Sequence, residues 1–173
     1  MKRITLTFFM FISLLTTAQE TPALKFFDKY SGQEGYTSIY ITKYMFDFFE
    51  KVSNDDEDKE FHEITSKLNA IKILTLDSAI NADKSVKFNS ELSQNLPKSD
   101  YKQMMVVKDG KQTINFIIKE KSNKISEFLM IVYGDGDPVL IILEGDINLK
   151  NISKLSKTMD INGFKYLDKI DKK

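Results

Sequence analysis

The sequence predicts an α+β fold, a two-layer sandwich with a mostly antiparallel sheet and with helices mainly on one face. Between residues 20 and 100, apolar side chains recur first with a period of two and then with a period near 3.6, which indicates strands and helices in turn. From residue 101 to residue 144, four short apolar runs are separated by turn residues. This second pattern is typical of an antiparallel meander of four strands, against which the helices are expected to pack.

Residues 1–19 have the pattern of a secretory signal peptide, with a basic start, an apolar run at residues 4–15 and small residues before Gln19. The apolar run is shorter than the roughly twenty residues that a membrane-spanning helix needs, so we expect no transmembrane anchor. Cleavage is expected after Ala18 or Gln19. The sequence therefore predicts a single α+β domain at residues 20–173, which is periplasmic or secreted.

The first elements of this domain follow from capping residues and side-chain spacing. Thr21 suits a helix N-cap, Pro22 suits the first helical position and Gly32 ends the turn, so a short helix is expected between them. Residues 36–42 are almost all β-branched or aromatic and predict the first strand. A helix is expected at residues 44–52, with a core-facing stripe formed by Tyr44, Met45, Phe48, Phe49 and Val52.

The remaining elements are predicted in the same way. An amphipathic helix at residues 61–68 is expected to lead directly into a strand at residues 71–76, which is apolar on both faces and therefore central. A weaker helical stripe from Phe88 to Leu96 ends at Pro97, which cannot continue a helix. The meander strands are expected at residues 104–107, 114–118, 128–133 and 139–143.

Turn residues delimit the meander. Asp109-Gly110 is a two-residue hairpin signal, because glycine accepts the positive φ of such turns. Gly145 is expected to end the last strand, and a helix at residues 149–159 is expected to lie across the sheet.

Composition excludes several classes of function. The chain has no cysteine, which excludes thiolate catalysis, zinc-thiolate sites and a lipid anchor, so the protein is not expected to be a lipoprotein. Removal of Lys2 and Arg3, which is the only arginine, leaves 23 basic against 25 acidic residues, a balance that does not favour nucleic acid. His62 is the only histidine, so no multi-histidine metal site exists. We predict no cofactor, no metal site and no catalytic residue.

Two acidic segments carry the oxygen ligands that calcium prefers. The segment from Asp55 to Asp58 lacks the ligand spacing and turn glycine of a calcium loop, so a solvated loop is the favoured interpretation. Residues 134–138 consist of Gly, Asp and Pro, which are ordinary turn residues, so a plain turn is favoured there.

An aromatic group in the first third is the candidate binding site. Tyr36, Ser38 and Tyr40 share one face of the first predicted strand, and a serine between two tyrosines suits either the floor of a groove or a surface covered by a helix. Phe46 does not fit the stripe of its helix, and an exposed Phe46 would belong to a contact patch. The alternative for all four residues is ordinary core packing.

Three segments resemble a family of exported domains of unknown function from Bacteroidota bacteria (DUF4252). They are residues 34–46, residues 101–128 with Val106-Val107-Lys108-Asp109-Gly110 at their centre, and residues 143–155 with Leu143-Glu144-Gly145-Asp146-Ile147-Asn148-Leu149. The resemblance implies an α+β envelope protein without an established activity or catalytic residue. It also implies a link to envelope stress, because the family's genes tend to lie near those for extracytoplasmic-function sigma factors. Some members look like lipoproteins, from which this chain departs. Asp77-Ser78-Ala79 matches the O-glycosylation pattern of these bacteria, and a strand-end turn explains it equally.

Three hypotheses for function follow. The first is a non-catalytic module that binds an envelope protein or a cell-wall component, through residues such as Tyr36, Ser38, Tyr40 and Phe46. The second is the binding of a small apolar or sugar ligand between the sheet and its helices. The third is a carboxylate-based hydrolase, which requires two acids with raised pKa values that converge in a cleft.

Overall fold

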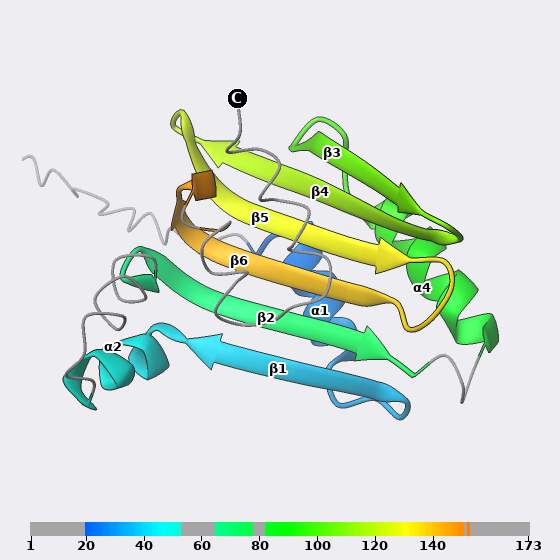
Figure 1. Ribbon diagram of the computed structural model, residues 1–173, viewed down its shortest axis with the longest axis horizontal. Coiled ribbons are helices and arrows are strands. Elements are labelled where there is room, and N and C mark those ends of the chain that lie inside the picture. Colours follow the sequence, from blue (N-terminus) through cyan, green and yellow to red (C-terminus); the bar gives the residue numbers. More distant parts are fainter. Residues whose placement is uncertain (1–19, 53–64, 78–81, 151, 153–173) are drawn as a thin grey trace, which may run out of the picture.

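The computed structural model describes residues 20–52, 65–77, 82–150 and 152, and these residues form an α+β fold with an open six-stranded antiparallel sheet (Figure 1). The elements in chain order are α1 (Pro22–Tyr30), β1 (Tyr36–Thr42), α2 (Lys43–Val52), β2 (Leu68–Leu76), α4 (Ala82–Asn95), β3 (Tyr101–Asp109), β4 (Gln112–Lys121), β5 (Lys124–Tyr133) and β6 (Val139–Ile147). The predicted fold class is confirmed. The predicted signal peptide, the acidic segment from Asp55 to Asp58, His62, Ser78 and most of the predicted helix at residues 149–159 lie outside the described residues.

The meander is confirmed as four consecutive antiparallel strands, β3 to β6. The strand order in the sheet is β1-β2-β6-β5-β4-β3, so β6 lies between the meander and β2, and β1 and β3 are the edge strands. The first hairpin turn is formed by Gly110 and Lys111, one residue later than predicted, and Gly110 has a φ of 60°. Residues 134–138 connect β5 to β6, which agrees with the plain-turn interpretation.

Strands β2 to β6 are longer than predicted, and one contact explains two of the differences, at the start of β2 and at the end of β6. β2 begins at Leu68 rather than at residue 71, and β6 continues through Gly145 to Ile147. Leu68 pairs with Gly145 next to a β-bulge, and the Asp146 N–H donates to the Lys67 carbonyl oxygen at 2.9 Å. This additional pairing between distant segments extends both strands, and local spacing around Leu68 indicated a helix instead.

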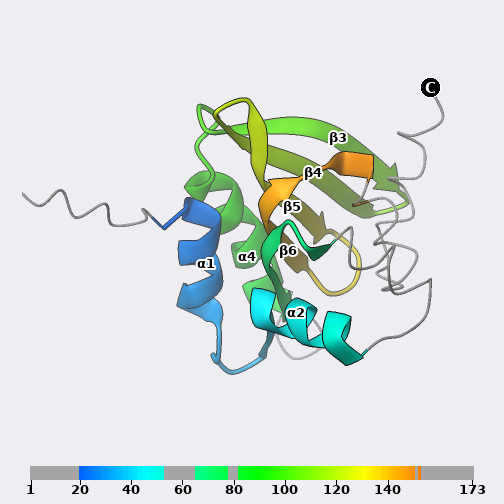
Figure 2. The same ribbon diagram turned by 90° about the vertical axis from the view of Figure 1, so that its left-hand side faces the viewer.

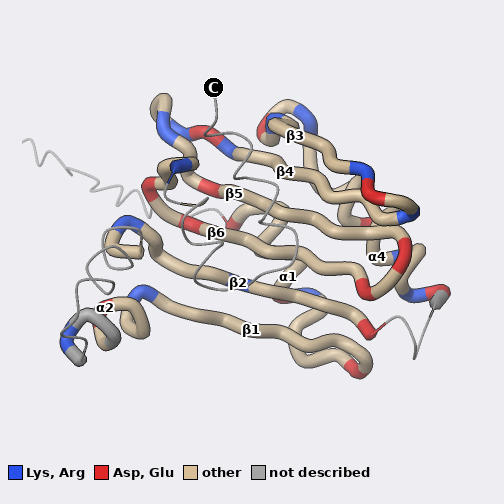
Figure 3. The backbone as a smooth tube through the Cα atoms, in the orientation of Figure 1, with Lys and Arg blue, Asp and Glu red and all other residues tan. Residues whose placement is uncertain are grey.

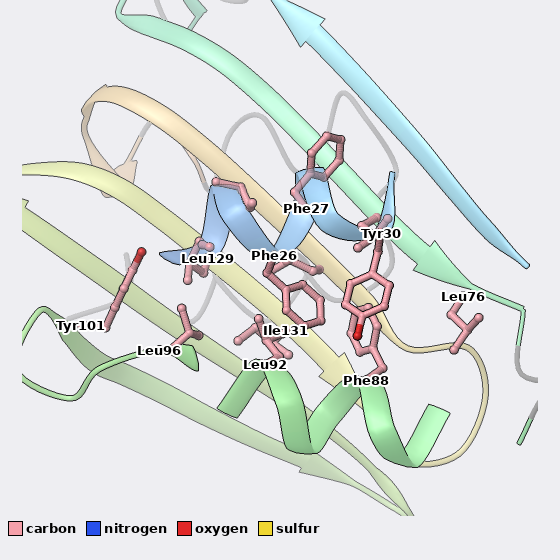
Figure 4. Packing of buried hydrophobic residues seen from close by; sticks show 14 residues of the cluster. Phe26, Phe27, Tyr30, Leu76, Phe88, Leu92, Leu96, Tyr101, Leu129 and Ile131 are labelled. Atoms are coloured by element: carbon pink, nitrogen blue, oxygen red, sulfur yellow. The ribbon is translucent and has the colours of Figure 1, made fainter. Parts of the chain in front are cut away.

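One face of the sheet, the helix face, is covered by α1 and α4, which lie side by side in Figure 2. The ring of Phe26 from α1 meets the ring of Phe88 from α4 edge to face, with centroids 5.2 Å apart (Figure 4). Leu129 and Ile131 on β5 and Leu140 and Ile142 on β6 complete this core. The helix face therefore holds the predicted sandwich of a sheet and its helices.

The opposite face carries a second core, which α2 reaches from the end of β1. Phe116 and Phe128 lie at its centre with ring centroids 6.0 Å apart, and both are fully buried. Phe46 of α2 belongs to this core. β5 is buried on both faces from Glu127 to Val132, so this strand of the meander lies between the two cores.

Candidate binding surface

Tyr36, Ser38 and Tyr40 do share one face of β1, and this face changes from covered to open along the strand. The Tyr36 ring stacks on the Tyr30 ring of α1 with centroids 4.9 Å apart, and Ser38 accepts a hydrogen bond from the Ser31 hydroxyl at 2.9 Å. Tyr40 is 59% exposed. Of the three predicted residues on β1, only Tyr40 offers a large open surface.

Tyr40 borders a buried positive charge. The Lys72 ammonium lies 4.9 Å from the centroid of the Tyr40 ring and 5.4 Å from that of Phe27, so it sits between two aromatic faces. It also lies 3.9 Å from a carboxylate oxygen of Glu144. One side of the Tyr40 ring is thus oriented by Lys72, while the remainder faces outward.

Phe46 is only 4% exposed and belongs to a core cluster, so the condition for a contact patch around it is not met and the alternative of core packing applies to this residue. The predicted core-facing stripe of this helix is also wrong, because Tyr44 is 85% exposed and Met45 and Phe48 are exposed as well. α2 begins at Lys43 with no residue between it and β1. The end of the strand therefore sets the rotation of the helix, which turns Phe46 inward.

The rotation of α2 creates an apolar surface that sequence reasoning missed. Ile39 and Tyr40 on β1 are exposed, and the chain continues into the exposed side chains of α2. Among the described residues, the other large apolar side chains of comparable exposure are Val86 on α4 and Val106 on β3. We call the exposed apolar side chains of β1 and α2 the β1–α2 surface. Its members are Ile39, Tyr40, Tyr44, Met45 and Phe48. The missed signal was the direct junction between strand and helix.

The edge strand next to this surface, β1, lacks the features that usually protect the edge of a sheet. β1 has no charged residue and no proline, and it pairs with β2 in an uninterrupted register. The other edge strand, β3, carries Lys102, Lys108 and Asp109 and is interrupted by a β-bulge between Gln103 and Met105. Figure 3 shows the contrast, with β1 free of charged residues along its length. Charges and bulges are the usual devices that prevent edge strands from pairing with other chains, and β1 has neither.

Two carboxylates lie opposite each other on the helix face. Glu127 of β5 pairs in register with Glu144 of β6, and Glu127 is only 2% exposed. The Tyr101 hydroxyl donates to both oxygens of Glu127, at 3.1 and 3.2 Å, and the Thr21 hydroxyl donates to one of them at 3.2 Å. Thr21 is also the N-cap of α1 and accepts from the Leu24 N–H. Glu127 of β5 therefore connects the start of α1, through Thr21, with the start of β3, through Tyr101.

Burial raises the pKa of Glu127 and the pKa of Glu144, so two acids with raised pKa values do converge, as a carboxylate hydrolase would require. Lys72 opposes the effect of burial on the pKa of Glu144. However, Glu127 is covered by α1 and engaged by two hydroxyl groups, which leaves it no approach for a substrate. We interpret this pair as a structural link.

We expect Glu127→Gln to stabilise the protein relative to wild type as the pH rises. Because burial raises the pKa of Glu127 above its ordinary value of 4.5, the folded state holds this proton more tightly than the unfolded chain. The stabilising contribution is complete below the ordinary value and is lost as the pH rises through the raised pKa. Glutamine stays neutral and still accepts from Tyr101. Urea unfolding at a series of pH values measures the difference, which should grow as the pH rises from the ordinary value through the raised pKa of Glu127 and then stay constant.

The matched control for this prediction is Glu120→Gln, which changes an exposed carboxylate on the neighbouring strand. This carboxylate pairs with Lys102 at the surface, and an exposed ion pair contributes little, so the difference between Glu120→Gln and wild type should stay small throughout the pH series. Parallel stability curves for wild type and Glu127→Gln would contradict the assignment.

The described part of the chain contains no group of three or more His, Cys, Asp or Glu side chains arranged to hold a metal ion. Its helices include none that is both long enough and apolar enough to cross a membrane.

Comparison with known proteins gives one match. No curated protein matches the chain significantly, and no solved structure does either. The model of a domain of unknown function, DUF4252, matches residues 30–155, which include β1, α2 and the whole meander. Since the match covers well over half of the 173 residues, the chain belongs to the DUF4252 family.

Proposed function

We propose that this protein is an exported, non-catalytic binding module that holds a protein partner at the β1–α2 surface. The observation that carries the proposal is the concentration of exposed apolar side chains on one continuous segment, from Ile39 to Phe48. Large apolar side chains that are exposed close together in the chain, on either side of an edge strand and along the helix that follows it, are typical of an interaction site. The set contains two tyrosines, one phenylalanine and one methionine, and these residue types are enriched at protein interfaces.

The neighbouring edge strand supports a protein as the partner rather than a cell-wall component. An extended segment of another protein can add a strand to an open edge, and the backbone groups of the outer side of β1 supply the hydrogen bonds. Alternate side chains of β1 then supply specificity, because Ile39 and Tyr40 point to opposite faces of the sheet. A polysaccharide would make no use of a regular row of backbone donors and acceptors.

The cellular location in this proposal is inferred from the sequence. The signal-peptide pattern of residues 1–19 supports export, and the absence of cysteine supports a periplasmic or secreted state without a lipid anchor. A role in envelope stress is consistent with that location.

Site-specific photo-crosslinking in envelope extract tests the surface. A benzoylphenylalanine at Tyr44 should give a discrete adduct that mass spectrometry identifies as one protein. The same probe at Val86, which is exposed on α4, is the matched control and should not give that adduct. Adducts common to both positions, or none at Tyr44, would overturn the proposal.

A paired substitution then measures affinity for the recovered protein. Tyr44→Glu places a charge in the apolar contact and should weaken binding about tenfold or more, whereas Val86→Glu should leave it unchanged. Both positions are exposed on helices, so neither change should affect folding. Equal affinities for the two variants would place the contact elsewhere.

A further inference from the structure

A cavity of about 200 Å³ lies between α4 and strands β3, β4 and β5, toward the sheet edge opposite to β1. Figure 4 shows α4 crossing these strands on the helix face. The floor of the cavity is apolar, with Ile117 on β4 and Ile131 on β5, and Leu96 closes the side near the end of α4. This site is separate from the β1–α2 surface and does not depend on the function proposed for it.

Polar side chains surround this apolar floor. Because alternate residues of a strand point to the same face, Asn115 joins Ile117 on β4 and Tyr133 joins Ile131 on β5. The Asn115 amide donates to the Tyr133 hydroxyl at 3.3 Å, which orients both groups. Gln103, paired in register with Ile117, brings another amide from β3.

The fourth polar group is unsatisfied within the protein. Asn89 of α4 lines the cavity, and its Oδ1 is buried and accepts no hydrogen bond from the described protein groups. A buried carbonyl oxygen without a donor is destabilising, so the great majority of such groups in folded proteins are paired. The oxygen itself is covered in this structure, whereas the Asn89 side chain lines the cavity, so a rotation of the amide would present the oxygen to a ligand with an O–H or N–H donor.

We propose that this cavity binds a monosaccharide ring. Three amides and a tyrosine hydroxyl offer the donors and acceptors that ring hydroxyls need, and the isoleucine floor suits the C–H face of a sugar. The volume lies below the range of about 300–1,000 Å³ for drug-sized ligands, which limits the site to one ring. No carboxylate lines the cavity, and Lys98 does, so a cationic sugar is disfavoured.

Two probes that differ in charge test the ligand class. N-acetylglucosamine is neutral and has an amide N–H that can donate to Asn89 Oδ1, whereas glucosamine has the same ring with a positive charge. In a titration of the purified protein followed by ¹H–¹⁵N NMR, N-acetylglucosamine should shift the amide signals of residues around the cavity and bind about tenfold more tightly than glucosamine. No shifts with N-acetylglucosamine, or equal binding of the two sugars, overturns the proposal.

Asn89→Leu tests the residue that carries the argument. It should abolish the N-acetylglucosamine shifts and, because it removes an unpaired buried oxygen, raise the thermal midpoint of the ligand-free protein. Gln94→Leu makes the same kind of change on the exposed side of α4 and should preserve binding. Unchanged binding by Asn89→Leu overturns the proposal even if the variant is more stable. Loss of the Tyr44 crosslink would leave this site untouched, so the two proposals fail separately.

Discussion

Gly145→Ala should lower the free energy of unfolding by about 3–4 kcal/mol, because it combines backbone strain with a clash between two strands. Gly145 has a φ of 142°, in a region that residues with a side chain rarely adopt. A Cβ there would lie 2.2 Å from the Lys67 carbonyl oxygen and 2.8 Å from the Leu68 Cα. Both atoms belong to backbone, which cannot move away without breaking the junction between β2 and β6. Urea denaturation monitored by circular dichroism measures the loss.

Gly136→Ala separates the two causes. Gly136 also has a positive φ, of 90°, but a Cβ at this position would have no heavy atom within 4 Å. Its substitution should therefore cost only the backbone strain, about 1 kcal/mol. If both variants lost the same stability, the close approach of the two strands at Gly145 would be contradicted.

Phe46→Ala should be the other large effect, at about 3–4 kcal/mol of lost stability. Phe46 is buried in the core between α2 and the sheet, and truncation leaves a cavity that its neighbours can fill only in part. Tyr44→Ala, two residues earlier on the same helix, should change stability by less than about 0.5 kcal/mol, because the Tyr44 side chain is almost fully exposed. Denaturant titration of both variants measures the difference.

This pair discriminates between two orientations of α2. The opposite order, with a large loss for Tyr44→Ala and a small one for Phe46→Ala, would restore the stripe that the sequence alone predicts. In the expected order, the same Tyr44 variant is well folded and suitable for binding measurements on the β1–α2 surface.

Local signals in the sequence predicted most of the described elements of the fold. Thr21 and Pro22 predicted the start of α1, Pro97 the end of α4, and the alternating apolar runs the four meander strands. Such signals depend only on neighbours in the chain. The order of strands depends on which segments pair across long distances, so the position of β6 between β2 and β5 could not be predicted from spacing.

The candidate sites were harder to predict for two physical reasons. In α2 the apolar and aromatic residues lie on more than one side of the helix, so spacing permits two inward faces, and the choice depends on the junction at Lys43. In the meander, Asn115 alternates with apolar residues and Gln103 stands beside Lys102, and both patterns are ordinary for a strand with one face in solvent. Only the position of α4 over that face turns these amides into the lining of a cavity.

The difference between the two edges of the sheet limits what β1 can assemble. A protein whose sheet is open at both edges can propagate head to tail into a filament, since each added strand exposes another site. Among the described strands, the charges and the bulge protect β3, whereas β1 has neither feature. Under the proposed pairing each copy of this protein offers one edge, so copies of this chain should not join head to tail into fibres.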